Sequence, residues 1–95
     1  MQNFEFTVSL SGKKFVGNNV VVFKNRFAKF VVGNCRPSSW GGTRCTPQDA
    51  RMNAEDYARK NFTLNQWRVS KINGIDEFIY LTSIKPVSQR PVGDF

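Results

Sequence analysis

Residues that could do chemistry are concentrated between Lys13 and Arg44, and the chemistry they suit is the binding of an anion. This acid-free stretch contains seven basic residues and no Asp or Glu. The rest of the chain contains seven residues of each sign, so the formal charge of +7 arises here. Clustered cations bind phosphates, and nearby aromatic rings can stack on bases. The basic candidates are Lys13, Lys14, Lys24, Arg26, Lys29, Arg36 and Arg44.

Trp40 is the aromatic candidate, and it lies in a long predicted loop, residues 33–43. Pro37 lacks the backbone N–H that a strand ladder uses, and Gly41-Gly42 has a backbone conformational freedom that no helix or strand needs. The indole could fold back onto the edge of the core. Alternatively it could stack on a base or act as a hot spot against a protein.

Other aromatic residues could form an exposed platform of the kind that RNA-binding sheets use. A chain of 95 residues needs most of its aromatic side chains inside, so we expect the majority to be core. The aromatic residues considered are Phe4, Phe6, Phe15, Phe23, Phe27, Phe30, Trp67 and Tyr80.

The inventory of side chains argues against an enzyme. The chain has no His, so Ser–His and Cys–His mechanisms lack their base. Glu55 and Asp56 are expected in helix ion pairs, Asp76 opposite Lys71, and Glu77 alone and facing solvent. Two thiolates make only half of a usual zinc site, so we expect neither a metal nor a cofactor.

Cys35 and Cys45 bracket the long loop and could form a disulfide if the flanking segments lie side by side. The N-terminus lacks the order of a signal peptide, and no apolar run reaches the roughly 18 residues of a membrane span. We therefore expect no membrane partner and a cytoplasmic protein (in the host cytoplasm if phage-encoded) with reduced thiols.

Residues 4–32 have the pattern of an antiparallel meander of three or four strands. Apolar and polar residues alternate from Phe4 to Leu10, which predicts a half-buried strand. A turn is expected at residues 11–14, a turn or bulge at 17–19, and a tight connection at 25–26.

A helix is predicted to begin after Thr46, which can act as the N-cap, with Pro47 in the first turn and Asp49 completing a capping box. A small apolar face should pack on the sheet. The outer face should be electrically balanced through pairs four residues apart. The packing face consists of Ala50, Ala54, Tyr57, Ala58 and Asn61, and the pairs are Arg51–Glu55, Glu55–Arg59 and Asp56–Lys60.

Asn73-Gly74 predicts a two-residue turn between two extended segments within residues 66–82. That turn sets the register of the hairpin and places aromatic residues opposite one another. The expected pairs are Ile72 with Ile75, Lys71 with Asp76, Val69 with Phe78, and Trp67 with Tyr80.

Together these patterns predict an α+β fold, with an antiparallel sheet of about five to six strands and a single helix packed on one face. The order is meander, helix, then Asn-Gly hairpin. Residues 1–84 are expected to form one domain, and residues 85–95 an extended C-terminal tail.

The expected function is that of a small, basic, non-enzymatic protein that binds nucleic acid through the sheet and loops of residues 13–44. The alternative is a protein-interaction module, such as a phage- or mobile-element-type inhibitor that docks on an acidic or nucleoprotein target.

Overall fold

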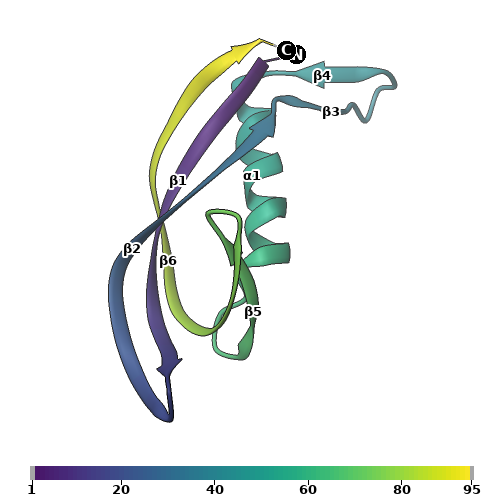
Figure 1. Cartoon of the computed structure of the whole chain (residues 1–95). Helices are drawn as coiled ribbons and strands as arrows, with labels where there is room; N and C mark the ends of the chain where they lie inside the picture. The colour runs from purple at the N-terminus through teal and green to yellow at the C-terminus, as the bar shows by residue number, and fades with distance from the viewer. Residues whose placement is uncertain (1, 95) are drawn as a thin grey trace.

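The computed structural model describes residues 2–94 and has an α+β fold with one helix (Figure 1). A four-stranded sheet has the order β2-β1-β6-β5, and a separate two-stranded ribbon pairs β3 with β4. The expectation of one sheet with five to six strands is therefore wrong. The elements are β1 (Gln2–Val16), β2 (Asn19–Gly33), β3 (Cys35–Pro37), β4 (Thr43–Cys45), α1 (Pro47–Asn61), β5 (Trp67–Ile72) and β6 (Ile75–Asp94).

Two long strands, β1 and β2, replace the predicted meander of three or four. They join at a turn in which Gly17 has a φ of 61°. The turns expected at 11–14 and 25–26 are instead one irregularity within the pair, because the register shifts between Leu10 and Gly12. Asn25, with a φ of 54°, lies in the extra segment opposite this shift. Turn-forming residues here make a bulge inside a continuous strand.

The predicted C-terminal tail is part of the sheet as far as Asp94, and only Phe95 lies outside the described residues. The second half of β6 pairs with β1 along its length. Pro86 and Pro91 suggested an irregular tail, since proline disrupts strand ladders. Both are tolerated because β5 pairs only with the first part of β6, which leaves a free edge. Each proline also lies beside a register shift.

Helix α1 begins with the predicted cap. Thr46 Oγ1 accepts a hydrogen bond from the backbone N–H of Asp49, and the Asp49 carboxylate accepts one from the backbone N–H of Thr46. Ala50 is buried, Ala54 is part of the hydrophobic core, and Tyr57 packs at the side of that core. The helix therefore covers the sheet with small residues and one large anchor.

The β5–β6 hairpin has the register that an Asn-Gly turn requires: Trp67 lies opposite Tyr80, Val69 opposite Phe78, and Lys71 opposite Asp76. Asn73 and Gly74 both have positive φ, 51° and 83°. This backbone suits the right-handed twist of the paired strands.

The sheet curls so that the hairpin and the helix share one hydrophobic core. At the hairpin tip, the Asn73 side chain accepts a hydrogen bond from the Lys29 backbone N–H at 2.9 Å and donates one to the Phe27 carbonyl at 3.2 Å. The hairpin thereby reaches the outer edge of β2. The core consists of Val8, Leu10, Ala28, Phe30, Ala54, Phe62, Ile72, Ile79 and Leu81.

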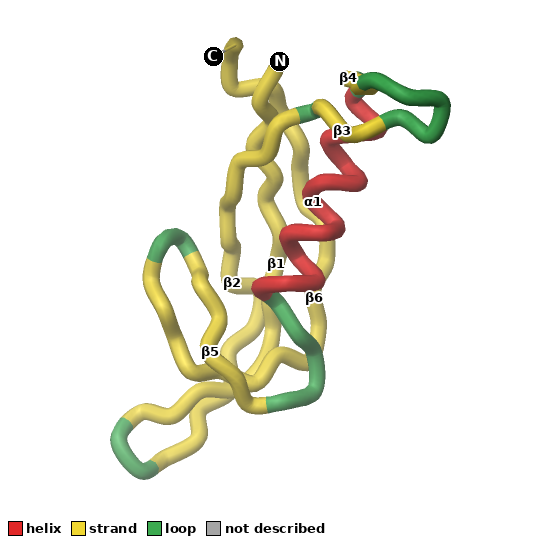
Figure 2. The backbone as a smooth tube through the Cα atoms, turned by 90° about the vertical axis from the view of Figure 1, so that its right-hand side faces the viewer, coloured by secondary structure: helices red, strands yellow, loops and turns green. Residues whose placement is uncertain are grey.

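The sheet has a core face and an open face, because successive side chains of a strand point to opposite sides. Phe6, Val8 and Leu10 of β1 lie on the core face, which α1 covers; the helix lies in front of the strands in Figure 2. Thr7 and Ser9 are buried within the sheet but are on its other face, called here the open face, against which the described helix does not pack. The molecule is elongated, with extents of 51 × 25 × 19 Å.

Candidate nucleic-acid interface

The acid-free stretch is divided among separate parts of the fold. Lys13 and Lys29 lie on the open face, whereas Lys14 is on the core face in the pair with Ile79. Lys24 lies within the bulge of β2, and Arg26 directly follows it. Arg36, Trp40 and Arg44 belong to the β3–β4 ribbon, at the end of the molecule where both termini lie (Figure 1). The eight candidates therefore do not form one site.

Arg26 is engaged by an acid that the sequence suggested to be alone. Its guanidinium binds Glu77 with two hydrogen bonds, one of 2.8 Å between Nη1 and Oε1. These bonds hold the pKa of Glu77 below its usual value, against the opposing effect of burial. The expectation that Glu77 faces solvent is therefore wrong. The two residues are 51 positions apart, so no local pattern could reveal the pair.

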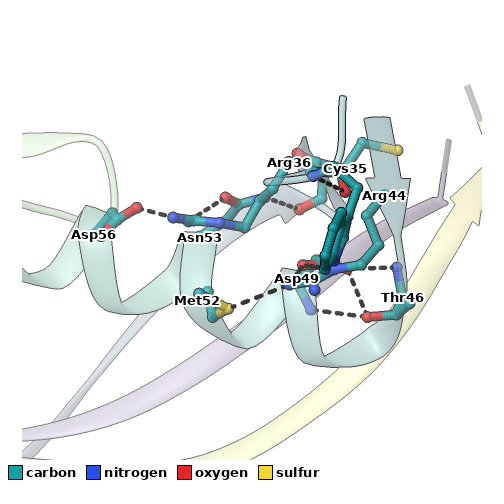
Figure 3. A network of polar contacts seen from close by, with 11 residues as sticks. Cys35, Arg36, Arg44, Thr46, Asp49, Met52, Asn53 and Asp56 are labelled. Carbon is teal, nitrogen blue, oxygen red and sulfur yellow. Dashed lines mark hydrogen bonds and ion pairs between the residues drawn. The ribbon is translucent and has the colours of Figure 1, made fainter. Parts of the chain in front are cut away.

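The other two arginines attach the ribbon to the helix (Figure 3). Arg36 Nη1 donates to Asn53 Oδ1 at 2.9 Å and to Asp56 Oδ2 at 2.7 Å. Arg44 donates from Nε and Nη2 to Asp49 at 2.7–3.1 Å. Each charge is thus matched by a helix carboxylate, and both arginines hold the ribbon against the helix.

Asp49 combines the helix cap with the ribbon contact. Its side chain is fully buried and receives hydrogen bonds from Arg44 and from Thr46. The bonds from Arg44 and then those from Thr46 lower its pKa to about 2, although burial opposes this. Asp56 has a lowered pKa for a similar reason, because Arg36 and Arg59 both donate to it. The predicted pairing of Asp56 with Lys60 is replaced by these two contacts.

Cys35 and Cys45 form a disulfide, so the expectation of reduced thiols is wrong for this structure. The two residues are opposite each other in the ribbon, with Cα atoms 4.1 Å apart. Asn53 supports the same corner by donating to the carbonyls of Gly33 and Cys35. The register of the ribbon, which its sequence does not specify, brings the sulfurs together.

Trp40 does not cover the core, because 97% of its surface is exposed at the ribbon tip. The tip is ordered by its own hydrogen bonds. Ser38 N–H donates to the Gly42 carbonyl at 3.0 Å, and Gly41 N–H donates to the Ser38 carbonyl at 3.1 Å. Of the two interpretations of Trp40, only the exposed one agrees with the structure.

The open face carries cations that have no ion pair among the described side chains. Lys13 lies in β1 with its Nζ 4.8 Å from the centre of the Tyr80 ring. Lys29 is opposite Thr7, and Lys85 is opposite Ser9. Lys85 lies outside the acid-free stretch, and only strand pairing across the sheet reveals it.

The acidic side chains of the open face already have basic partners in the same chain. Glu5 accepts a hydrogen bond from Arg90 Nε at 3.0 Å. Asp76 lies 3.9 Å from Lys71, the residue opposite it in the hairpin. Among the described side chains, the lysines are therefore the unmatched charges of this face.

The aromatic candidates divide between core and surface. Phe4 and Phe30 are buried, and Phe6 and Phe23 pack against the core as expected. Phe15 and Phe27 are instead about half exposed on the open face. Trp67 and Tyr80 share that face and are partly exposed, and Phe78 joins them. The hairpin register was the signal that could have assigned Phe78 to the surface.

In residues 2–94, no three His, Cys, Asp or Glu side chains are grouped in a way that could hold a metal ion. The one described helix is too short and too polar to cross a membrane. Comparisons of this chain with protein-family models, curated proteins and solved structures found no match.

Proposed function

We propose that this chain is a small non-enzymatic protein that binds nucleic acid through the open face of its sheet. The observation that carries the proposal is the combination of lysines without acid partners and half-exposed aromatic rings on one uncovered surface. Phosphates attract clustered lysines, and counterion release strengthens the contact. Exposed rings offer stacking surfaces for bases.

The proposal keeps only part of the sequence stretch that first suggested it and adds a residue from outside that stretch. Arg26, Arg36 and Arg44 are bound to acids of the same chain and lose most of their value as phosphate contacts. Lys13 and Lys29 remain, and Lys85 joins them from β6. The interface is thus a surface of three strands and not a continuous segment.

Charge reversal at matched positions tests the proposal. Lys29→Glu and Lys85→Glu should each weaken binding to labelled oligonucleotides of any sequence. Each should also reduce the slope of log affinity against log salt by about 0.7–0.9. Fluorescence anisotropy across a salt series measures both quantities. The backbone contact of Lys29 with Asn73 is unaffected by the change of side chain.

Lys60→Glu is the matched control, because Lys60 is an exposed lysine on α1, on the other side of the sheet. It makes the same change in net charge and should leave the salt slope unchanged. Equal effects at positions 29, 85 and 60 would show that total charge, and not the open face, governs binding. In that case the proposed interface is wrong.

The ribbon supports a second candidate function, that of a protein-interaction module, including the inhibitor considered above. The specific observation is the exposure of Trp40 on a ribbon braced by a disulfide and two ion pairs. Its tip, residues 38–43, contains only Ser, Trp, Gly and Thr, a composition common in protein-recognition loops. A preformed loop also loses little entropy on binding.

Photo-crosslinking separates the second candidate from the first. A photoreactive side chain at position 40 should capture a discrete protein in cells that express the chain, and the same group at position 29 should not. Capture of nucleic acid at position 29 alone supports the open face. Labelling of the same protein from both positions would contradict a docking role specific to the ribbon.

A further inference from the structure

One end of the open face carries an aromatic cluster, formed by Phe15 of β1, Trp67 of β5, and Phe78 and Tyr80 of β6. The Phe15 and Trp67 rings are 4.7 Å apart at an interplanar angle of 28°. Trp67 and Phe78 are 5.5 Å apart at 19°, and Phe15 and Phe78 are 6.5 Å apart at 11°. The three rings are thus nearly parallel.

The cluster is not part of the hydrophobic core. The opposite side of the same strands supplies buried residues, namely Ile72, Ile79 and Leu81. Phe15 and Phe78 remain 49% and 51% exposed. A sheet with one face in the core normally has polar residues on the other. Contiguous exposed apolar groups of this kind mark interaction sites.

The positive charge around the aromatic cluster favours a polyanion over a second copy of the chain as its ligand. Lys13 lies in the same row of the sheet as Tyr80 and Trp67, and Lys29 and Lys85 continue the positive surface along the strands. A second copy bound face to face about a two-fold axis would bring two positively charged surfaces together. A polyanion would instead be attracted by each of these lysines along the face.

Single strands fit this combination better than duplexes. In a duplex the bases stack on one another and are paired, so ring faces on a protein surface have only the backbone to contact. An unpaired strand presents base faces that can extend a row of parallel rings, which is the usual mode of sequence-tolerant single-strand binding.

The spacing of the lysines suits an extended single strand of nucleic acid. Lys29 is opposite Thr7, which is six residues from Lys13 along β1. At about 3.3 Å per residue this separation is on the order of 20 Å. A strand whose bases lie on the cluster can therefore place phosphates on Lys13 and continue to Lys29 and Lys85.

We propose that the open face binds single-stranded nucleic acid, with bases stacked on Phe15 and Phe78 and phosphates held by Lys13, Lys29 and Lys85. This inference rests on the proposed function and specifies its ligand. Its stacking residues are those of the sheet and do not include Trp40 of the ribbon.

The test compares labelled dT20, rU20 and a 20-base-pair DNA duplex at the same salt concentration. The intact chain should bind at least one of the single strands about tenfold or more tightly than the duplex, and the difference between dT20 and rU20 tells whether DNA or RNA is preferred. Phe78→Ala should weaken single-strand binding roughly 5- to 150-fold with an unchanged salt slope, and should leave duplex binding unchanged.

Val87→Ala is the control, because it removes another exposed apolar side chain from β6 away from the cluster. If Phe78→Ala fails to fold, Phe15→Ala provides the same comparison. A Trp40→Phe background also leaves Trp67 as the single tryptophan. Its fluorescence should be quenched by the preferred single strand and not by the duplex.

The outcomes separate this inference from the function on which it rests. Equal affinity for duplex and single strands, or equal losses for both in Phe78→Ala, overturns the stacking inference and leaves nucleic-acid binding in place. Absence of binding to all three probes near physiological salt overturns both.

Discussion

At the scale of single residues, Gly12 permits the central strand to pass close to its neighbour. A Cβ atom at this position would lie 2.1 Å from the Tyr80 carbonyl oxygen. We expect Gly12→Ala to lower the free energy of unfolding by about 1–3 kcal/mol, because β1 and β6 would have to separate. Urea denaturation measures this change.

Gly17→Ala is the comparison for Gly12. Gly17 lies in the turn that follows β1, where an added Cβ atom would have no neighbour within 4 Å. Only the φ of 61° disfavours alanine at this position. The expected loss is about 1 kcal/mol. A greater loss at Gly17 than at Gly12 would mean that the close approach to Tyr80 does not constrain the sheet.

Asp49 should make the stability of the protein sensitive to acid. Its pKa is about 2 in the folded chain and about 3.9 in an unfolded one, so the unfolded chain takes up the proton first as pH falls. The stabilisation is complete above about pH 5 and is lost progressively as pH falls towards 2. Thermal unfolding midpoints between pH 5 and 2 test this.

Asp49→Asn should unfold at a lower temperature near neutral pH and depend less steeply on pH below 4. Some dependence should remain, because Asp56 and Glu77 also have lowered pKa values. Asp76→Asn, at an exposed carboxylate 3.9 Å from Lys71, is the control. An unchanged acid profile in Asp49→Asn would contradict the role given to the Arg44–Asp49 pair.

At the scale of elements, local patterns predicted the helix and the hairpin, and non-local contacts explain the errors. Thr46 and Asp49 form a cap within four residues, and Asn73-Gly74 sets a register by its own backbone. Whether Gly12 marks a turn or a close approach depends on β6, almost 70 residues away. The acidic partners of Arg26 and Arg36 are also distant in sequence, 51 and 20 positions away.

The β3–β4 ribbon should lose stability when its disulfide is reduced. The bridge closes a short loop between residues 10 positions apart, for which chain entropy gives about 2–3 kcal/mol. Guanidinium denaturation with and without a phosphine reductant measures the effect, and the Cys35→Ser, Cys45→Ser variant should reproduce it. Affinity for dT20 should not change while the protein stays folded, since the ribbon is not part of the open face. A parallel loss of affinity would place the ribbon in the interface.

At the scale of the whole molecule, folding redistributes the charge that the sequence concentrates. The acid-free stretch becomes part of β1, all of β2 and the ribbon, and its three arginines meet acids from α1 and β6. Lys85 reaches the open face from the far end of the chain. A linear charge count leads to the prediction of an anionic ligand, but it carries no information on which surface of the folded chain presents the charge.

One side chain at the hairpin tip helps to hold the curl of the sheet, together with the Arg26–Glu77 pair between β2 and β6. Asn73 accepts from the Lys29 N–H and donates to the Phe27 carbonyl, so the hairpin tip is held against β2. Asn73→Gly keeps a residue that adopts positive φ and removes both contacts. We expect a loss of about 1–3 kcal/mol, the sum of two modest hydrogen bonds. The Lys29 amide should also exchange its hydrogen faster, as measured by NMR, whereas amides between β1 and β6 should keep their protection.

Asn73→Asp keeps the acceptor and loses the donor, so its loss of stability should fall between zero and that of Asn73→Gly. Unchanged exchange at Lys29 in Asn73→Gly would mean that the hairpin is held over the core by its other contacts, namely the Arg26–Glu77 pair and the burial of Ile72 and Ile79.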